Sequence, residues 1–125
     1  MLLKKIVLRN ENQFATAIVD WANKHTIDVE IFDGKESLFD IVDSLVVFQE
    51  DHNVPKETRD LQDSIEKFHN PALQIDINAT MSASVASLLF WLENNKPKCV
   101  LFVGEDKITE SARFEDYMGK LAKGL

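Results

Sequence analysis

Short apolar runs alternate with segments of helical period along the whole chain. Five runs rich in β-branched residues are typical of strands buried on both faces; they lie at 4–8, 28–32, 44–48, 73–77 and 99–103. Between them, apolar residues recur at the i, i+4, i+7 spacing of a helix stripe. This alternation predicts five parallel strands, each followed by a helix, in a three-layer α/β domain.

Three of the expected helices each have a clear apolar stripe. The stripes are Phe14, Ile18 and Trp21, then Leu61, Ile65 and Phe68, and finally Phe114, Met118 and Leu121, and we expect all nine side chains to be buried. Pro71 ends the third helix, because the residue before a proline is pushed out of the helical region. The second helix, at about 35–42, is expected to be short.

The length and the charge favour a single domain that binds neither membranes nor nucleic acid. With 125 residues, 45% of them hydrophobic, the chain suits a single domain spanning 1–125. No apolar run reaches the roughly 20 residues that cross a bilayer, so we expect a soluble, cytoplasmic protein with no membrane association. A formal charge of −7 opposes attraction to nucleic acid, and we expect none to bind this domain alone.

Cysteine and histidine give little support for redox or metal chemistry. Cys99, the single cysteine, lies in an apolar run and is expected to be a buried structural thiol. The three histidines stand alone without ligand spacing, which favours surface or capping roles over zinc binding.

Chemistry in a parallel sheet is expected beyond the carboxyl ends of the strands. The chain has only four glycines and none follows the first strand, so a dinucleotide or P-loop cradle is poorly supported. No G-x-S-x-G elbow is present. The remaining candidates are carboxylates: Glu11, Asp33, Glu50, Asp51 and Asp76. They could hold Mg²⁺ with oxygen ligands, or be loop charges and helix N-terminal acids.

Three stretches resemble the response-regulator receiver domains of two-component signalling. These are KKIVLRNEN, FDGKESL and DSLVVFQEDHNVP, all within the first 55 residues, and the order of elements matches over the whole chain. The resemblance implies a flavodoxin-like, receiver-like (βα)5 fold with parallel sheet order 2-1-3-4-5. It also implies an acidic pocket in which Glu11 and Asp51 would bind Mg²⁺.

The residue in the phosphoacceptor place depends on how the third strand is counted. Counting back from Pro55 gives Asp51, whereas counting forward along the strand gives Gln49, which is no carboxylate nucleophile. The resemblance makes Thr80 the candidate switch hydroxyl, with Asn78 and Ser82 competing for that position. It makes Lys107 the candidate supporting lysine, although Lys107 lies several residues late. The family's acidic pair is reduced to Asn10 and Glu11. The resemblance therefore implies an atypical receiver, or pseudo-receiver, with little or no phosphorylation.

The stretch ASVASLLFWL is apolar nearly all round a helix, so one buried stripe cannot hold all of it. Phe90 and Trp91 are the candidate interface residues, for a protein partner or a weak homodimer. Alternatively, either ring lies beneath neighbouring side chains.

Two functions follow from these observations. The first is a noncatalytic, receiver-like signalling or protein-interaction module. The second is a small Rossmann-like enzyme or binding protein for a nucleotide or sugar phosphate, using Glu11, Asp51 and Thr80 at the strand ends. The missing glycine cradle disfavours the second, and no cofactor beyond Mg²⁺ is indicated.

Overall fold

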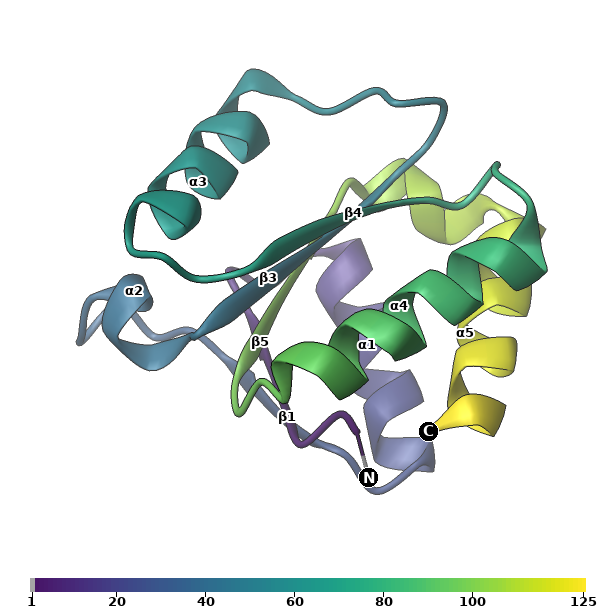
Figure 1. The fold of residues 1–125 in the computed structure, drawn as a ribbon, viewed down its shortest axis with the longest axis horizontal. Coiled ribbons are helices and arrows are strands. Elements are labelled where there is room, and N and C mark those ends of the chain that lie inside the picture. Colours follow the sequence, from purple (N-terminus) through teal and green to yellow (C-terminus); the bar gives the residue numbers. More distant parts are fainter. Residues whose placement is uncertain (1) are drawn as a thin grey trace.

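The computed structural model describes residues 2–125 and contains one five-stranded, all-parallel sheet with helices on both faces (Figure 1). The elements in chain order are β1 (Lys5–Leu8), α1 (Gln13–Lys24), β2 (Asp28–Ile31), α2 (Leu38–Ile41), β3 (Ser44–Gln49), α3 (Lys56–Lys67), β4 (Ala72–Asp76), α4 (Met81–Asn95), β5 (Val100–Gly104), the 3₁₀ helix η1 (Asp106–Glu110) and α5 (Ala112–Gly124). The predicted α/β class and the parallel sheet are confirmed.

The predicted strand order is wrong. The strands lie in the order β2-β1-β5-β3-β4, so β5 separates β1 from β3 and β4 forms an edge. The order 2-1-3-4-5 would instead have placed β1 beside β3 and β5 at the edge. The resemblance to receiver domains therefore extends to the order of elements along the chain and not to the order of strands in the sheet.

Burial explains why β5 is central. Four of its five residues are buried and it carries no charge, whereas β4 reads ALQID and includes the exposed Gln74. A strand between two neighbours and under two helix layers must be apolar on both faces, while an edge strand tolerates polar residues. This contrast between CVLFV and LQIDI was visible in the sequence.

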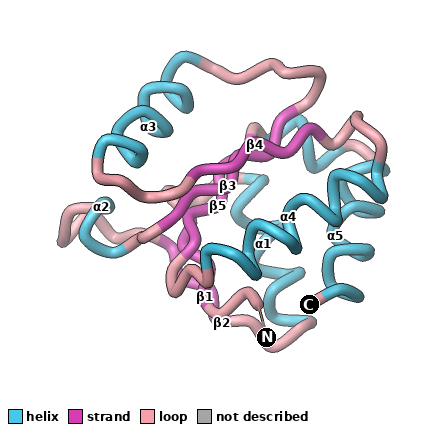
Figure 2. Tube along the Cα trace, viewed as in Figure 1, coloured by secondary structure: helices cyan, strands magenta, loops and turns pink. Residues whose placement is uncertain are grey.

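Strand order also decides which helices share a face. α1, α4 and α5 cover one face of the sheet, and α2 and α3 cover the other (Figure 2). The chain changes face whenever its direction across the sheet reverses, as right-handed crossovers require. α4 is therefore a neighbour of α5, and the Tyr117 hydroxyl of α5 donates a hydrogen bond to Ser84 O of α4 at 3.1 Å.

Eight of the nine predicted stripe residues are buried, and the exception is Phe68. α3 ends at Lys67, so Phe68 is the residue after the helix and its ring is 60% exposed. The ring lies 5.5 Å from that of Phe39, measured between centroids. Cys99 is only partly buried, against the cluster beneath α2 and α3.

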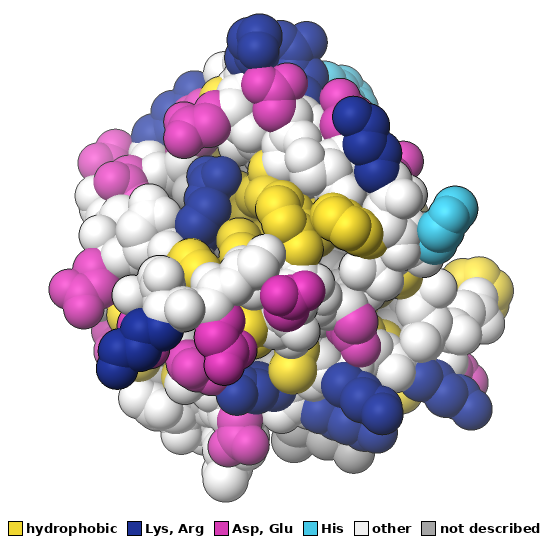
Figure 3. Space-filling view, turned by 90° about the vertical axis from the view of Figure 1, so that its left-hand side faces the viewer, with side chains coloured by type: hydrophobic (Ala, Val, Ile, Leu, Met, Phe, Trp, Pro, Cys, Tyr) yellow, Lys and Arg dark blue, Asp and Glu magenta, His cyan; other side chains and the backbone are white. Residues whose placement is uncertain are grey.

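The short α2 leaves apolar side chains partly uncovered on its side of the molecule. α2 has only four residues, and Phe32, Leu38 and Phe39 are partly buried there. On this side, hydrophobic side chains gather in one patch surrounded by charged ones (Figure 3). Among residues 2–125, no helix has both the length and the apolarity needed to cross a membrane.

Candidate functional site at the carboxyl ends of the strands

The amide-rich stretch NENQF, residues 10–14, leads from β1 into α1. Asn12 is the N-cap residue, and its side-chain oxygen accepts a hydrogen bond from Ala15 N–H at 2.7 Å. The Asp106 carboxylate accepts from Phe14 N–H at 3.0 Å. A helix N-terminus of this kind binds phosphate in nucleotide-binding folds. Here the Asp106 carboxylate of the same chain, 92 residues from Phe14 in sequence, takes the place of the phosphate.

The crevice between β1 and β5 is filled by an aromatic ring. Phe14 lies over Gly104, where a Cβ atom would come within 2.5 Å of the ring. The hollow that remains between these strand ends has a volume of about 20 Å³. A second hollow, between the ends of β3 and β5, has about 10 Å³. These volumes suit a single water, whereas small-molecule sites measure about 300–1,000 Å³.

A polar network joins the ends of β3 and β4. One oxygen of the Asp76 carboxylate accepts from Asp51 N–H at 3.1 Å and from Asn78 N–H at 2.9 Å. The Asn78 amide in turn donates to the Asp51 carboxylate at 3.1 Å. These bonds hold a strained turn, since Asp51 and His52 have φ angles of 54° and 61°. Asp76 thus acts as a clamp between the two loops.

Gln49, which also lies at the carboxyl ends of the strands, is buried. It ends β3, is 3% exposed, and its Nε2 lies 3.5 Å from His52 Nδ1. His52 Nε2 lies 3.6 Å from the Asp76 carboxylate. Among the described side chains, Gln49 Oε1 is a buried acceptor without a hydrogen-bond partner. Gln49 also lines the 10 Å³ hollow between the ends of β3 and β5.

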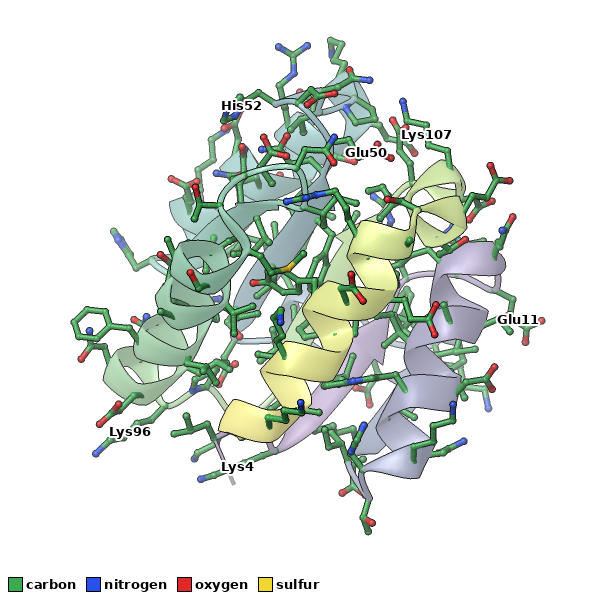
Figure 4. The ribbon with its side chains drawn as sticks, turned by 90° about the vertical axis from the view of Figure 1, so that its right-hand side faces the viewer. Lys4, Glu11, Glu50, His52, Lys96 and Lys107 are labelled. Atoms are coloured by element: carbon green, nitrogen blue, oxygen red, sulfur yellow. The ribbon has the colours of Figure 1, made fainter. Side chains whose placement is uncertain are left out.

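The structure does not bring together the two residues expected to bind Mg²⁺. Glu11 lies at the start of α1 and lines a groove with Asp20 and Ile31, on the β2 side. Its side chain points outward, away from His52 (Figure 4). Asp51 lies beyond β3, two strands across the sheet from β1. Among residues 2–125, no group of three or more His, Cys, Asp or Glu side chains could hold a metal ion.

The other expected site residues lie apart as well. β3 ends at Gln49, and Asp51 lies two residues further along, in the loop that follows. Thr80 is exposed at the start of α4 and makes no side-chain capping bond there. Lys107, in η1, pairs with Glu105 at 3.2 Å. Glu11 lines the groove beside β2 and Thr80 the groove beside β4, so these two candidates do not share a pocket.

Sequence reasoning missed the residues that organise this edge. Arg113, near the start of α5, donates to Ile77 O at 2.8 Å and to Ala79 O at 2.7 Å, which fixes the loop between β4 and α4. Asp76 was one carboxylate among several, and Asp106 was not considered. No local pattern marks these three, because each bonds backbone groups that lie far away in the sequence.

The expected interface residues on α4 differ in exposure. Phe90 is 66% exposed, whereas Trp91 is partly buried against the main core. Beside the exposed face of α4, an open groove of about 420 Å³ runs along β4 and is lined by Leu73, Ile75, Ala83 and Ser87 among others. A comparable hollow of about 380 Å³ lies between α1 and α5, with charged groups at its rim.

No family model, no curated protein and no solved structure matches this chain.

Proposed function

We propose that the protein is a noncatalytic interaction module that associates through the exposed face of α4. The observation that carries the proposal is the 66% exposure of Phe90 on a helix otherwise anchored in the core. A large aromatic side chain left in water on an ordered helix is an apolar contact available to a partner. The signalling role expected from the receiver resemblance is part of this proposal as its biological setting.

The hydrogen bonds and the packing at the carboxyl ends of the strands support a noncatalytic role. The carboxylates there accept hydrogen bonds from backbone N–H groups of the chain itself, and a phenylalanine ring fills the crevice between β1 and β5. A nucleotide or sugar phosphate would need room and free anion-binding N–H groups at that place. This is why we favour interaction over the enzymatic alternative.

Association through this face is expected to be weak. A contact centred on one aromatic side chain must offset the loss of translational and rotational freedom, which leaves a dissociation constant of about a micromolar. We take a second copy of the chain as the partner to test first, because this requires no other protein.

The test compares two exposed phenylalanines. Phe90→Glu should shift the wild-type dimer to monomer in sedimentation velocity, because the carboxylate would be desolvated in the contact. Phe68→Glu is the matched control, since Phe68 is similarly exposed (60%) but lies at the end of α3, and this variant should still dimerise. Both variants should keep nearly the wild-type thermal midpoint.

Two results would contradict the proposal. One is a wild-type protein that stays monomeric at every concentration measured. The other is equal weakening by both substitutions, which would point to a general effect of added negative charge on a chain that already carries −7.

A further inference from the structure

β4 has an unpaired edge. It is the last strand of the sheet and pairs only with β3 among the described residues. Pro71 O accepts from β3 at 3.1 Å and Ile77 N–H donates to β3 at 3.0 Å, so the odd-numbered residues direct their backbone groups inward. Alternate residues of a parallel strand face opposite sides. Backbone groups of Ala72 and Gln74 therefore point toward solvent, as does the Asp76 N–H, whereas the Asp76 carbonyl accepts from Ala79 N–H at 3.2 Å.

This edge lacks the usual protection. Natural edge strands carry lysines, prolines or bulges that discourage pairing with another strand. β4 reads ALQID, with neither lysine nor proline, and is paired without interruption to β3 over its whole length. Its one charged side chain, Asp76, is bound to the neighbouring loop.

The surface that continues from this edge is almost free of charge. The chain has 14 Lys and Arg and 21 Asp and Glu residues, yet only Asp76 lies within 72–92, which spans β4 and most of α4. At the chain's average of 28% charged, this stretch would hold about six. The centre of a protein interface is depleted of charge in the same way.

The groove beside β4 links the edge to Phe90. Its floor is formed by Leu73 and Ile75, and one wall by Ala83 and Ser87 of α4. Phe90 follows Ser87 at i+3 and so lies further along the same helix face. Edge, groove and aromatic ring thus form one continuous surface.

We infer that two copies of the chain join their β4 edges antiparallel, which extends the two five-stranded sheets into one. The inference rests on the proposed function and adds the geometry of the contact. We take a second copy as the occupant because an open strand edge is self-complementary about a two-fold axis. Each chain carries −7, which opposes association, and the stretch 72–92 adds only Asp76 to this repulsion where the two copies would meet.

The register follows from the outward-facing residues. A two-fold axis at Gln74 places each Gln74 opposite its copy, and the two residues exchange both backbone hydrogen bonds. Ala72 then lies opposite Asp76 of the other copy, so the two Asp76 carboxylates do not meet at the axis. The α4 helices of the two copies flank the joined strands on the same face of the sheet.

Cysteine cross-linking tests this register. In a Cys99→Ser background, Gln74→Cys should form a disulfide-linked dimer under mild oxidation, because a bonded antiparallel pair has Cα atoms about 5.5 Å apart, within disulfide range. Glu30→Cys, at an exposed site on the other edge strand β2, is the control and should link at least tenfold more slowly. Equal rates would overturn the inference.

Proline substitution separates the inference from the proposed function. Gln74→Pro removes an outward N–H at the axis without breaking a bond to β3, and should raise the dimer dissociation constant by about tenfold or more. Gln74→Ala loses the side-chain bond to Gln62 but keeps the N–H, and should dimerise like wild type. If Phe90→Glu abolishes the dimer while Gln74→Pro and the cross-link have no effect, the strand pairing is wrong and the α4 face stands. A monomeric wild type overturns both.

Discussion

The carboxyl ends of the strands and the β4–α4 surface use their polar and apolar groups in opposite ways. At the strand ends, the Asp76 and Asp106 carboxylates accept hydrogen bonds from backbone groups of other loops, and Phe14 fills the crevice. At the β4–α4 surface, backbone groups of an edge strand and the Phe90 ring are left in water. At the carboxyl ends of the strands, where α/β proteins usually bind ligands, these polar groups are hydrogen-bonded within the chain. The backbone groups without a partner lie instead along the β4 edge of the sheet.

The two regions differ in how much binding free energy they can still provide to a partner. A group already bonded within the chain must lose that bond before it can bind a partner, so it contributes little net free energy. An unpaired strand edge and an exposed ring lose only water.

Gly104→Val should destabilise the protein most, by about 3 kcal/mol, because its side chain would meet the Phe14 ring in a filled crevice. Urea unfolding followed by circular dichroism measures this. Gly119→Ala is the control: nothing lies within 4 Å of the added Cβ, and alanine in the exposed part of α5 should stabilise by about 0.5–1 kcal/mol. A Gly104→Val protein of wild-type stability would mean that the crevice can open.

Asp76→Ala should cost about 2 kcal/mol, because the N–H groups of Asp51 and Asn78 lose their carboxylate acceptor. Hydrogen exchange at these two amides should accelerate more than exchange elsewhere in the sheet. Asp33→Ala is the matched control, since that carboxylate accepts one exposed backbone bond, from Lys35. Similar losses in both variants would show that Asp76 is no clamp.

Tyr117 tests how α4 is held to the core. Burial raises the pKa of the Tyr117 hydroxyl well above its ordinary value of 10, and the Ser84 side chain acts in the opposite direction with a smaller effect. The unfolded chain therefore loses this proton first as the pH rises above 10, so the free energy of unfolding falls there, by up to about 1.4 kcal/mol per pH unit. Below pH 10 this contribution is fully present.

Tyr117→Phe should lower stability by about 1 kcal/mol at neutral pH, through the lost hydrogen bond, and should flatten the alkaline decline. Urea unfolding at a series of pH values between 8 and about 11 measures both effects. An unchanged alkaline slope in the variant would show that other groups cause the decline.

The smallest expected effect is phosphorylation at Asp51. Incubation with a small phosphoryl donor and Mg²⁺ should give almost no acyl phosphate, because the strand end is Gln49 and Glu11 lies on the far side of β5. Intact-protein mass spectrometry measures this. Stoichiometric phosphate that disappears in Asp51→Asn would show instead that the carboxyl ends of the strands carry out phosphoryl transfer.

The candidate site was predictable from the sequence only where its contacts are local. The capping bond of Asn12 spans only three residues, which is the spacing that an N-cap side chain uses. The bonds of Asp106 and Arg113 span 92 and up to 36 residues, and no periodic pattern records contacts of that range. Phe90 was identified because a helix that is apolar all round must expose some of it.

By itself, the sequence determined the number, type and chain order of the main elements, the parallel sheet and eight of the nine stripe residues. These features depend on local periodicity and on short connections. The tertiary structure decided the strand order, the face that α4 covers and the exposure of Phe68. Each of these depends on which apolar strand is buried between two neighbours. That choice is made by packing across the whole sheet, where the uncharged β5 displaced β4 to the edge.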